Sequence, residues 1–136
     1  MRKQTAFMEQ RRLMGHLFTD IIIRGNKKEV KLKKVLIDTG ATYTVLPKEV
    51  LEEIGAWGPL SESWVELGNG KKVKAKAYAV KIKMKGVSAP AISITFKNCK
   101  PVIGVETLES IGLKLDPTTG RLEPTRPKGM AYFYKG

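Results

Sequence analysis

Hydrophobic and polar residues alternate along much of the chain with a period of two, the pattern of half-buried β-strands. From Leu17, the run "LFTDIII", a polar "RGNKKE" and the run "VKLKKVLI" predict a hairpin with Gly25-Asn26 in its turn. A second hairpin is expected at Gly68-Asn69-Gly70, which separates two alternating segments. The runs "APAISITF" and "LKLDPTTGRLEP" predict one more strand and a final strand pair.

The longest alternating segment, residues 72–84, changes phase near Ala79. Small or apolar residues take odd positions as far as Ala77 and even positions from Val80 onward, with lysine between them. Because successive side chains of a strand point to opposite faces, this change of phase indicates a bulge or a bend.

Two short helices are expected among these strands. After Pro47, apolar residues recur at helical spacing at Val50, Leu51 and Ile54, and Gly55 ends the segment. The run "PVIGVETLESIG", residues 101–112, predicts a short strand, a glycine and a second helix of about two turns. The chain is therefore expected to be mostly β. A strand followed by a short helix occurs twice, which suggests an internal duplication although the two halves share little identity.

Composition sets the limits of the interpretation. The 136 residues fit one domain, expected over 15–125, with no run of 18 apolar residues and no signal-peptide pattern. Residues 1–14 are either a frayed extension or precede a natural start at Met14, and residues 126–136 form a tail. A single cysteine excludes an intrachain disulfide and fits a cytoplasmic location, and one histidine beside it argues against a zinc site. We expect no metal or cofactor.

The formal net charge of +12 leaves two interpretations open, a nucleic-acid partner or a lysine-coated soluble surface. Lysine, rather than the better phosphate reader arginine, supplies most of the charge, and it alternates along strands such as 72–85. Aromatic residues do not interleave with it. We therefore favour a solvated face, with no nucleic-acid partner and no membrane partner.

One acidic residue, Asp38, stands out because it directly follows the apolar residues 35–37. An aspartate at a strand end is often a turn former or a helix cap, which stabilises by about 1 kcal/mol. No helix is expected before Pro47, however, and the apolar-leaning segment from Thr42 to Leu46 follows at once. A carboxylate between two buried strands is costly unless it is hydrogen-bonded or functional, so Asp38 is a candidate site residue.

The segment "LIDTGATYTVLP" resembles the active-site loop of aspartic proteases, in which Asp-Thr/Ser-Gly follows apolar residues. The later "PVIGVETLESIG" resembles the apolar-apolar-Gly strand and following helix of retroviral proteases, and the order of the elements between the two also matches. The resemblance covers about residues 17–122. It implies a retropepsin-like acid protease fold in a prokaryotic, single-domain member: one β-barrel-like domain with one or two short helices and a flap hairpin.

Proteases of this family use two aspartates that share one proton around a water, because adjacent like charges cannot both ionise easily. The chain has three aspartates; Asp20 lacks the Thr-Gly, and Asp116 is expected in a turn. The resemblance therefore implies a symmetric homodimer with one Asp38 from each subunit. In it Asp38, Thr39 and Gly40 form the catalytic loop. Thr39 bonds across the axis, and Gly40 lets the substrate backbone approach.

The resemblance also assigns substrate contacts. Ala41 lines the cleft, and the hairpin tip at Leu67, Gly68, Asn69 and Gly70 is a flap that closes over an extended peptide, with an ordinary hairpin as the alternative. The surrounding Lys, Ala and Val residues suggest pockets for small apolar side chains with a cationic rim. Where retroviral enzymes carry acidic residues after the loop, this chain has Thr42-Tyr43-Thr44. In retroviral dimers the chain ends form an interface sheet, so the tail 126–136 either joins such a sheet or is loose.

These features predict a cytoplasmic, homodimeric aspartic endopeptidase that hydrolyses extended peptide substrates. One alternative is a peptide- or protein-binding module on the same fold with weak or highly restricted proteolysis. Another is a basic nucleic-acid-binding β-domain, which would bind with a steep salt dependence and be indifferent to Asp38→Asn.

Overall fold

The protein was analysed as a computed structural model that describes residues 17–126. In chain order the elements are β1 (Phe18–Arg24), β2 (Glu29–Ile37), β3 (Thr44–Val45), α2 (Lys48–Ile54), β4 (Trp57–Glu66), β5 (Lys72–Met84), β6 (Val87–Thr95), β7 (Val102–Ile103), α3 (Val105–Ile111), β8 (Leu113–Asp116) and β9 (Arg121–Pro124). The expected mostly β chain with two short helices and turns near residues 25–26 and 68–70 is confirmed.

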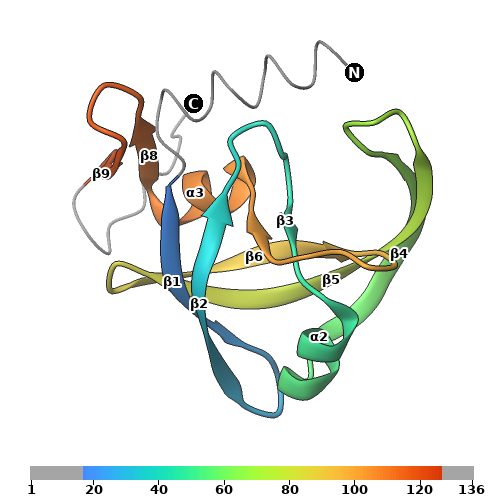
Figure 1. Ribbon diagram of the computed structural model, residues 1–136. Coiled ribbons are helices and arrows are strands. Elements are labelled where there is room, and N and C mark those ends of the chain that lie inside the picture. Colours follow the sequence, from blue (N-terminus) through green and yellow to red (C-terminus); the bar gives the residue numbers. More distant parts are fainter. Residues whose placement is uncertain (1–16, 127–136) are drawn as a thin grey trace, which may run out of the picture.

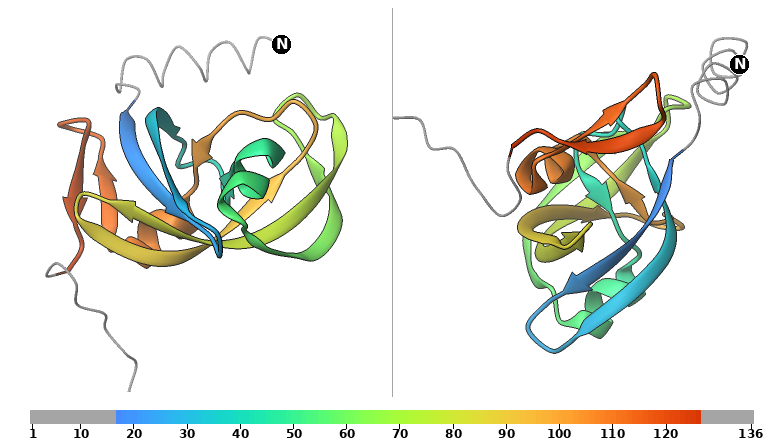
Figure 2. Two further views of the ribbon diagram at one scale, coloured as in Figure 1. Left: turned by 90° about the horizontal axis from the view of Figure 1, so that it is seen from below. Right: turned by 90° about the vertical axis from the view of Figure 1, so that its left-hand side faces the viewer.

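Six of the strands close into a barrel (Figure 1). The main sheet has the order β1-β2-β7-β3-β6-β5-β4, and an additional pairing of β1 with β5 closes it. The strand β4 pairs with β5 alone and extends the sheet beyond the barrel, whereas β8 and β9 form a separate small sheet (Figure 2). The barrel leaves the β4–β5 hairpin free on one side.

The two halves of the barrel repeat the same sequence of elements. The hairpin β1–β2 leads through a loop to β3 and α2, and the hairpin β5–β6 leads through a loop to β7 and α3. The halves interlock because β2 pairs with β7 and β3 pairs with β6, both in parallel. This arrangement agrees with the internal duplication suggested by the sequence.

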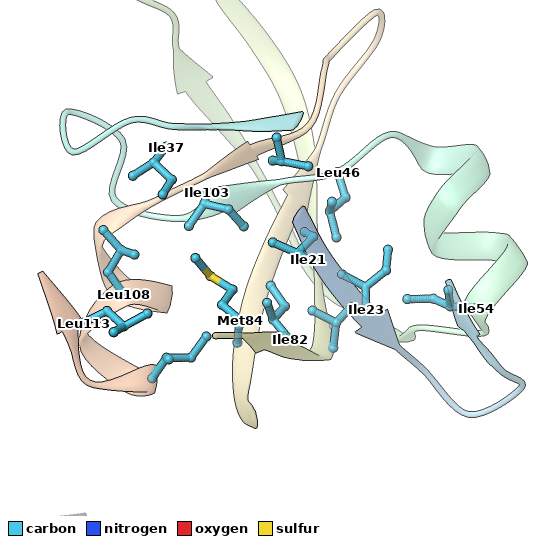
Figure 3. Close-up of a cluster of buried hydrophobic side chains, with 14 of the residues drawn as sticks. Ile21, Ile23, Ile37, Leu46, Ile54, Ile82, Met84, Ile103, Leu108 and Leu113 are labelled. Atoms are coloured by element: carbon cyan, nitrogen blue, oxygen red, sulfur yellow. The ribbon is translucent and has the colours of Figure 1, made fainter. Parts of the chain in front are cut away.

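The core fills the inside of the barrel. Its buried side chains come from β1, β2, β5, β7, β8, both helices and the segment after β3: Ile21, Ile23, Ile37, Leu46, Ile54, Ile82, Met84, Ile103, Leu108 and Leu113. Figure 3 shows them in one continuous cluster, from Leu113 and Leu108 at one end to Ile23 and Ile54 at the other. Each such side chain contributes about 1.5–3 kcal/mol by leaving water.

The change of alternation near Ala79 does not come from a bulge in β5. This strand pairs with β6 in one unbroken register from Lys76↔Thr95 to Met84↔Val87. The irregularity lies in the neighbouring β4, between Trp57 and Ser61. The strand β5 curves instead (Figure 1). The even-numbered residues of its second half, from Val80 to Met84, face the core, whereas those of its first half, from Lys72 to Lys76, lie in the β4–β5 hairpin and are exposed. The residues on this face therefore change from polar to apolar along the strand.

Both helices end at a glycine in the left-handed conformation, Gly55 with φ 70° and Gly112 with φ 86°. Such a backbone is accessible to glycine at little cost, so the two predicted helix ends are confirmed. Neither helix of the described residues is long and apolar enough to cross a membrane. The expected extension 1–14 and the tail residues 127–136 lie outside the described residues.

Candidate functional site

Asp38 directly follows the last residue of β2, at one end of the barrel. Val35 and Ile37, which precede it, are buried, and Leu36 is half-buried. The pairing of β2 with β7 ends in a hydrogen bond from the Asp38 amide to the Ile103 carbonyl, 2.9 Å long. Asp38 is therefore the first residue of its loop and is tied directly to the sheet.

The loop turns sharply around the Asp38 side chain. The Gly40 amide donates to the carboxylate Oδ1 at 2.9 Å, and the Ala41 amide donates to the Asp38 carbonyl at 3.0 Å. Asp38 and Ala41 are half-buried, whereas Thr39 and Gly40 are exposed. The structure therefore brings four of the predicted site residues together in one turn, with the carboxylate oriented by a backbone amide.

The far side of the loop is bound to the start of α3. The Val105 amide donates to the Ala41 carbonyl at 2.8 Å, and the Glu106 amide donates to the Thr42 carbonyl at 2.9 Å. The helix has no side-chain cap, so these loop carbonyls satisfy amides that the first turn leaves without a helical partner. The loop and the helix thus fix each other.

Gly104 makes this attachment possible because no side chain would fit there. A Cβ added to Gly104 would lie 2.5 Å from the carbonyl carbon and oxygen of Tyr43 and 2.9 Å from the Ala41 oxygen. Its φ of −94° is open to any residue, so the requirement is one of space. The glycine of the apolar-apolar-Gly strand therefore permits contact between the two halves.

A pair of buried hydroxyls completes the support, and sequence analysis did not identify it. The Thr44 hydroxyl, fully buried, lies 2.6 Å from the Thr107 hydroxyl and accepts a hydrogen bond from the Gly104 amide at 3.1 Å. In the sequence, Thr44 differs from the retroviral pattern, and this difference alone does not indicate a buried hydrogen bond. The available signal was a threonine beside Val45 and Leu46 in an otherwise apolar strand, where a polar group needs a partner.

The other two aspartates have local structural roles. The Asp20 carboxylate accepts the Lys34 amide at 3.0 Å, where the β1–β2 register is irregular. The Asp116 carboxylate accepts the Thr118 amide at 2.9 Å and the Thr119 hydroxyl at 3.2 Å. The first of these bonds is the main cause that holds the pKa of Asp116 below its ordinary value. Asp116 is the turn residue that the sequence predicted.

The remaining predicted residues, Leu67 to Gly70, form the tip of the β4–β5 hairpin. The Leu67 amide donates to the Lys71 carbonyl, the Gly70 amide donates to the Leu67 carbonyl, both at 2.8 Å, and the Lys71 amide donates to the Asn69 side chain at 2.9 Å. In Figure 1 this tip lies to the side of the β2–β3 loop, at the same end of the barrel. The hairpin is confirmed, and its role as a flap stays a prediction.

An apolar groove of about 460 Å³ borders the loop on the other side. Thr39 lines it together with Val105, Leu108, Leu113 and Leu115. Within residues 17–126, no group of three or more His, Cys, Asp or Glu side chains is arranged to hold a metal ion. The chemistry available at the loop is therefore that of a carboxylate, a hydroxyl and backbone amides.

The comparison with known protein families places this loop in context. A family model described as aspartyl protease matches residues 21–104, which run from β1 through the loop and the hairpin to Gly104. A search of curated proteins found no match.

The buried hydroxyl pair gives a first test. Replacing Thr44 by Val keeps the shape but leaves the Gly104 amide and the Thr107 hydroxyl without their partner, so we expect the free energy of unfolding to fall by about 1–3 kcal/mol. Urea denaturation at one protein concentration measures it. Thr42→Val, at an exposed side chain two residues away, is the control and should change stability by less than about 0.5 kcal/mol. Equal midpoints for the two variants would contradict this role of Thr44.

The close approach at Gly104 gives a second test. Gly104→Ala forces a methyl group into the Tyr43 carbonyl, so we expect a loss of about 1–3 kcal/mol in the free energy of unfolding. Gly68→Ala is the control, since Gly68 is exposed and is not among the residues with a positive φ. Thermal unfolding of the two variants compares them, and a Gly104→Ala protein as stable as its control would show that the loop tolerates the extra volume.

Proposed function

The chain belongs to the retropepsin-like aspartyl protease family, and we propose that it is an aspartic endopeptidase whose water-activating group is Asp38. The observation that carries the proposal is the position of Asp38, at the end of the β2–β7 pairing, with its carboxylate held by the Gly40 amide. The anchoring of this loop to Gly104 and α3 supports a role for Asp38 beyond turn formation.

The proposed reaction needs two carboxylates. One, ionised, takes a proton from a water, which attacks the peptide carbonyl carbon; the other, protonated, donates a hydrogen bond to the carbonyl oxygen. The carbon–nitrogen bond of the tetrahedral intermediate then breaks, the amine takes up the proton that the first carboxylate had accepted from water, and the other product is a carboxylic acid. Each residue of the pair changes protonation state, so we expect a bell-shaped dependence of the rate on pH.

We propose that the second carboxylate comes from another copy of the chain. Asp20 and Asp116 are engaged elsewhere in the described residues. The loop that corresponds to residues 38–43 in the other half of the barrel is 96–101, of the same length, and it begins with Phe96 in place of an aspartate. A homodimer with the two Asp38 loops on its axis would supply the pair.

The groove beside Thr39 supports this arrangement. Val105 and Leu115 line it beside the exposed Thr39 and are only half-buried, and the lining also carries Glu109, Lys114 and Arg126. A second copy related by two-fold symmetry would cover Val105 and Leu115 and bring the two Thr39 hydroxyls together. The proposed contribution of the tail 126–136 to the same interface would add to this contact.

The β4–β5 hairpin supports an extended peptide as the substrate. The strand β4 is paired on one side only among the described strands, so its free edge offers amides and carbonyls to a peptide backbone. We propose that the tip, Leu67 to Gly70, closes over the peptide together with the cleft residue Ala41. A cytoplasmic location is part of the proposal, supported by the single Cys99.

Cleavage of an unfolded protein is the direct test of the activity. We expect the parent protein to cut such a substrate at acidic to neutral pH and Asp38→Asn to be slower by about 10²- to 10⁴-fold, because Asn can neither accept nor donate the proton. Asp116→Asn, which changes an aspartate in a turn, is the matched control and should retain activity. Peptide products are counted by mass spectrometry.

The outcomes separate the candidate functions. Equal cleavage by the parent and Asp38→Asn would contradict the role of Asp38. No cleavage by either, with both proteins dimeric, would favour a binding module on the same fold. An affinity for RNA or DNA that falls steeply with salt concentration, and that Asp38→Asn does not change, would favour the nucleic-acid alternative.

Dimer formation gives the second test of the proposal. Thr39→Ala removes one proposed hydrogen bond from each subunit, so we expect the dimer dissociation constant to rise by about tenfold or more. Asp38→Asn should leave the fold intact and keep or strengthen the dimer, since it removes like-charge repulsion at the axis. Analytical ultracentrifugation measures the constants, with the exposed Thr42→Ala as control. A Thr39→Ala protein that dissociates like the parent would show that Thr39 does not bond across the axis.

A further inference from the structure

The strand β5 carries lysine on the face that elsewhere forms the core. Val80, Ile82 and Met84 are at most 1% exposed and point into the barrel. Because β5 keeps one register with β6 from Lys76 to Met84, its even-numbered side chains stay on one face. Lys76, which is exposed, therefore leaves the strand on the same side as the core residues.

This face opens into a cavity of about 610 Å³ between the β4–β5 hairpin, the start of α2 and the loop 96–101. Pro47, Tyr78 and Phe96 supply apolar wall, and the charged side chains of the lining are Lys48, Glu49, Glu62, Lys74, Lys76 and Lys97. Asp38 does not line the cavity. The loop 96–101, which supplies part of the lining, leads directly into β7, whose Ile103 carbonyl binds the Asp38 amide, so the chain connects the cavity wall to the strand that supports the site.

The ion pairs of the lining leave positive charge for a ligand. Glu62 is paired with Lys74 at 3.4 Å, and Lys48 pairs with Glu52 at 3.7 Å, one turn further along α2. Within the described part of the chain, no ion pair involves Lys76, Lys97 or Glu49. The described lining therefore has two unpaired ammonium groups, of Lys76 and Lys97, and one unpaired carboxylate, of Glu49. The apolar residues beside them can pack against the methylene groups of a bound side chain.

We infer that this cavity binds an acidic side chain of the peptide substrate, glutamate above all. The methylene groups of glutamate would pack on Tyr78 and Phe96, while its carboxylate would lie with the ammonium groups of Lys76 and Lys97. This selectivity rests on the proposed peptidase function and names its substrate class. It adds an acidic side chain to the sequence-based expectation of small apolar pockets with a cationic rim, because lysines are among the residues that line this cavity.

A peptide fits the cavity better than a nucleic acid. The charged groups are lysines, and the described lining contains no arginine for bidentate binding of phosphate. Glu49 and Glu62 would repel the successive phosphates of a nucleic-acid backbone. A single glutamate carboxylate can bind near the lysines without lying close to either of them. The neighbouring free edge of β4 also offers backbone groups that match an extended peptide.

Binding to the Asp38→Asn protein tests the inference without any need for turnover. Fluorescently labelled short peptides are prepared in pairs that differ only in Glu or Gln at one position, and fluorescence anisotropy gives their dissociation constants. We expect the Glu member of at least one pair to bind about fivefold tighter. Adding Lys76→Gln and Lys97→Gln should abolish this difference while leaving binding of the Gln member unchanged.

A matched control removes the same charge from the opposite face of the strand. Lys81→Gln and Lys83→Gln change two exposed lysines that alternate with the buried residues of β5 and lie outside the cavity lining. This double variant should keep the preference for Glu. If it loses the preference as fully as the Lys76 and Lys97 variant does, the effect comes from net charge and the inference is overturned.

Further outcomes separate this inference from the proposed function. Equal binding of Glu and Gln peptides, or no peptide binding, overturns the selectivity even if the parent protein cleaves other substrates. A single-stranded oligonucleotide that binds more tightly than every Glu peptide, and depends on Lys76 in the same way, also overturns it. Preferential Glu binding without cleavage by the parent supports the selectivity and contradicts the peptidase proposal. Where cleavage occurs, the ratio of kcat/KM for the two peptides should match the binding ratio.

Discussion

The site depends on one close approach of two backbone segments, where Gly104 lies against the carbonyl groups of Tyr43 and Ala41. On one side of this contact the Asp38 amide binds the Ile103 carbonyl, and on the other the Val105 amide binds the Ala41 carbonyl. The contact needs a residue without a Cβ, since the nearest atoms would lie 2.5 Å from one. The position of the carboxylate is therefore set by a strand and a helix that follow it by more than sixty residues in the chain.

The near-repeat of the barrel explains why this support exists in the chain and why two loops correspond although only one of them carries an aspartate. Each half provides a hairpin, a loop and a short strand that pairs with the other half, so the loops 38–43 and 96–101 occupy corresponding places. The first carries a carboxylate, whereas the second carries Phe96 and Lys97 and forms cavity wall. Under the proposed function, one loop supplies the catalytic acid and the other helps to select the substrate, and a second copy supplies the missing acid.

Local signals in the sequence were sufficient for most elements. Gly25-Asn26 and Gly68-Asn69-Gly70 marked hairpins, and Gly55 and Gly112 marked helix ends, because turns and helix ends demand particular residues within a few positions of the chain. The pairing of Thr44 with Thr107 could not be predicted in this way, since their hydroxyls meet only after β3 and α3 pack together. The change of alternation in β5 could be seen in the sequence, but its cause could not. Alternation shows which face of a strand is polar, and it does not show which part of the fold that face packs against.

The sequence by itself determined both helices and most of the strands, the family resemblance and the identity of Asp38 as the one aspartate followed by Thr-Gly, whereas the first half of β4 was not predicted. These follow from residue types at short spacing, where backbone conformation and side-chain period leave few choices. Only the tertiary structure decided that Gly104 must lack a side chain, that Thr44 supports the loop, and that Lys76 faces a cavity. Each of these depends on which distant segment lies opposite a residue, and that is fixed by the closure of the barrel and the interlocking of its halves.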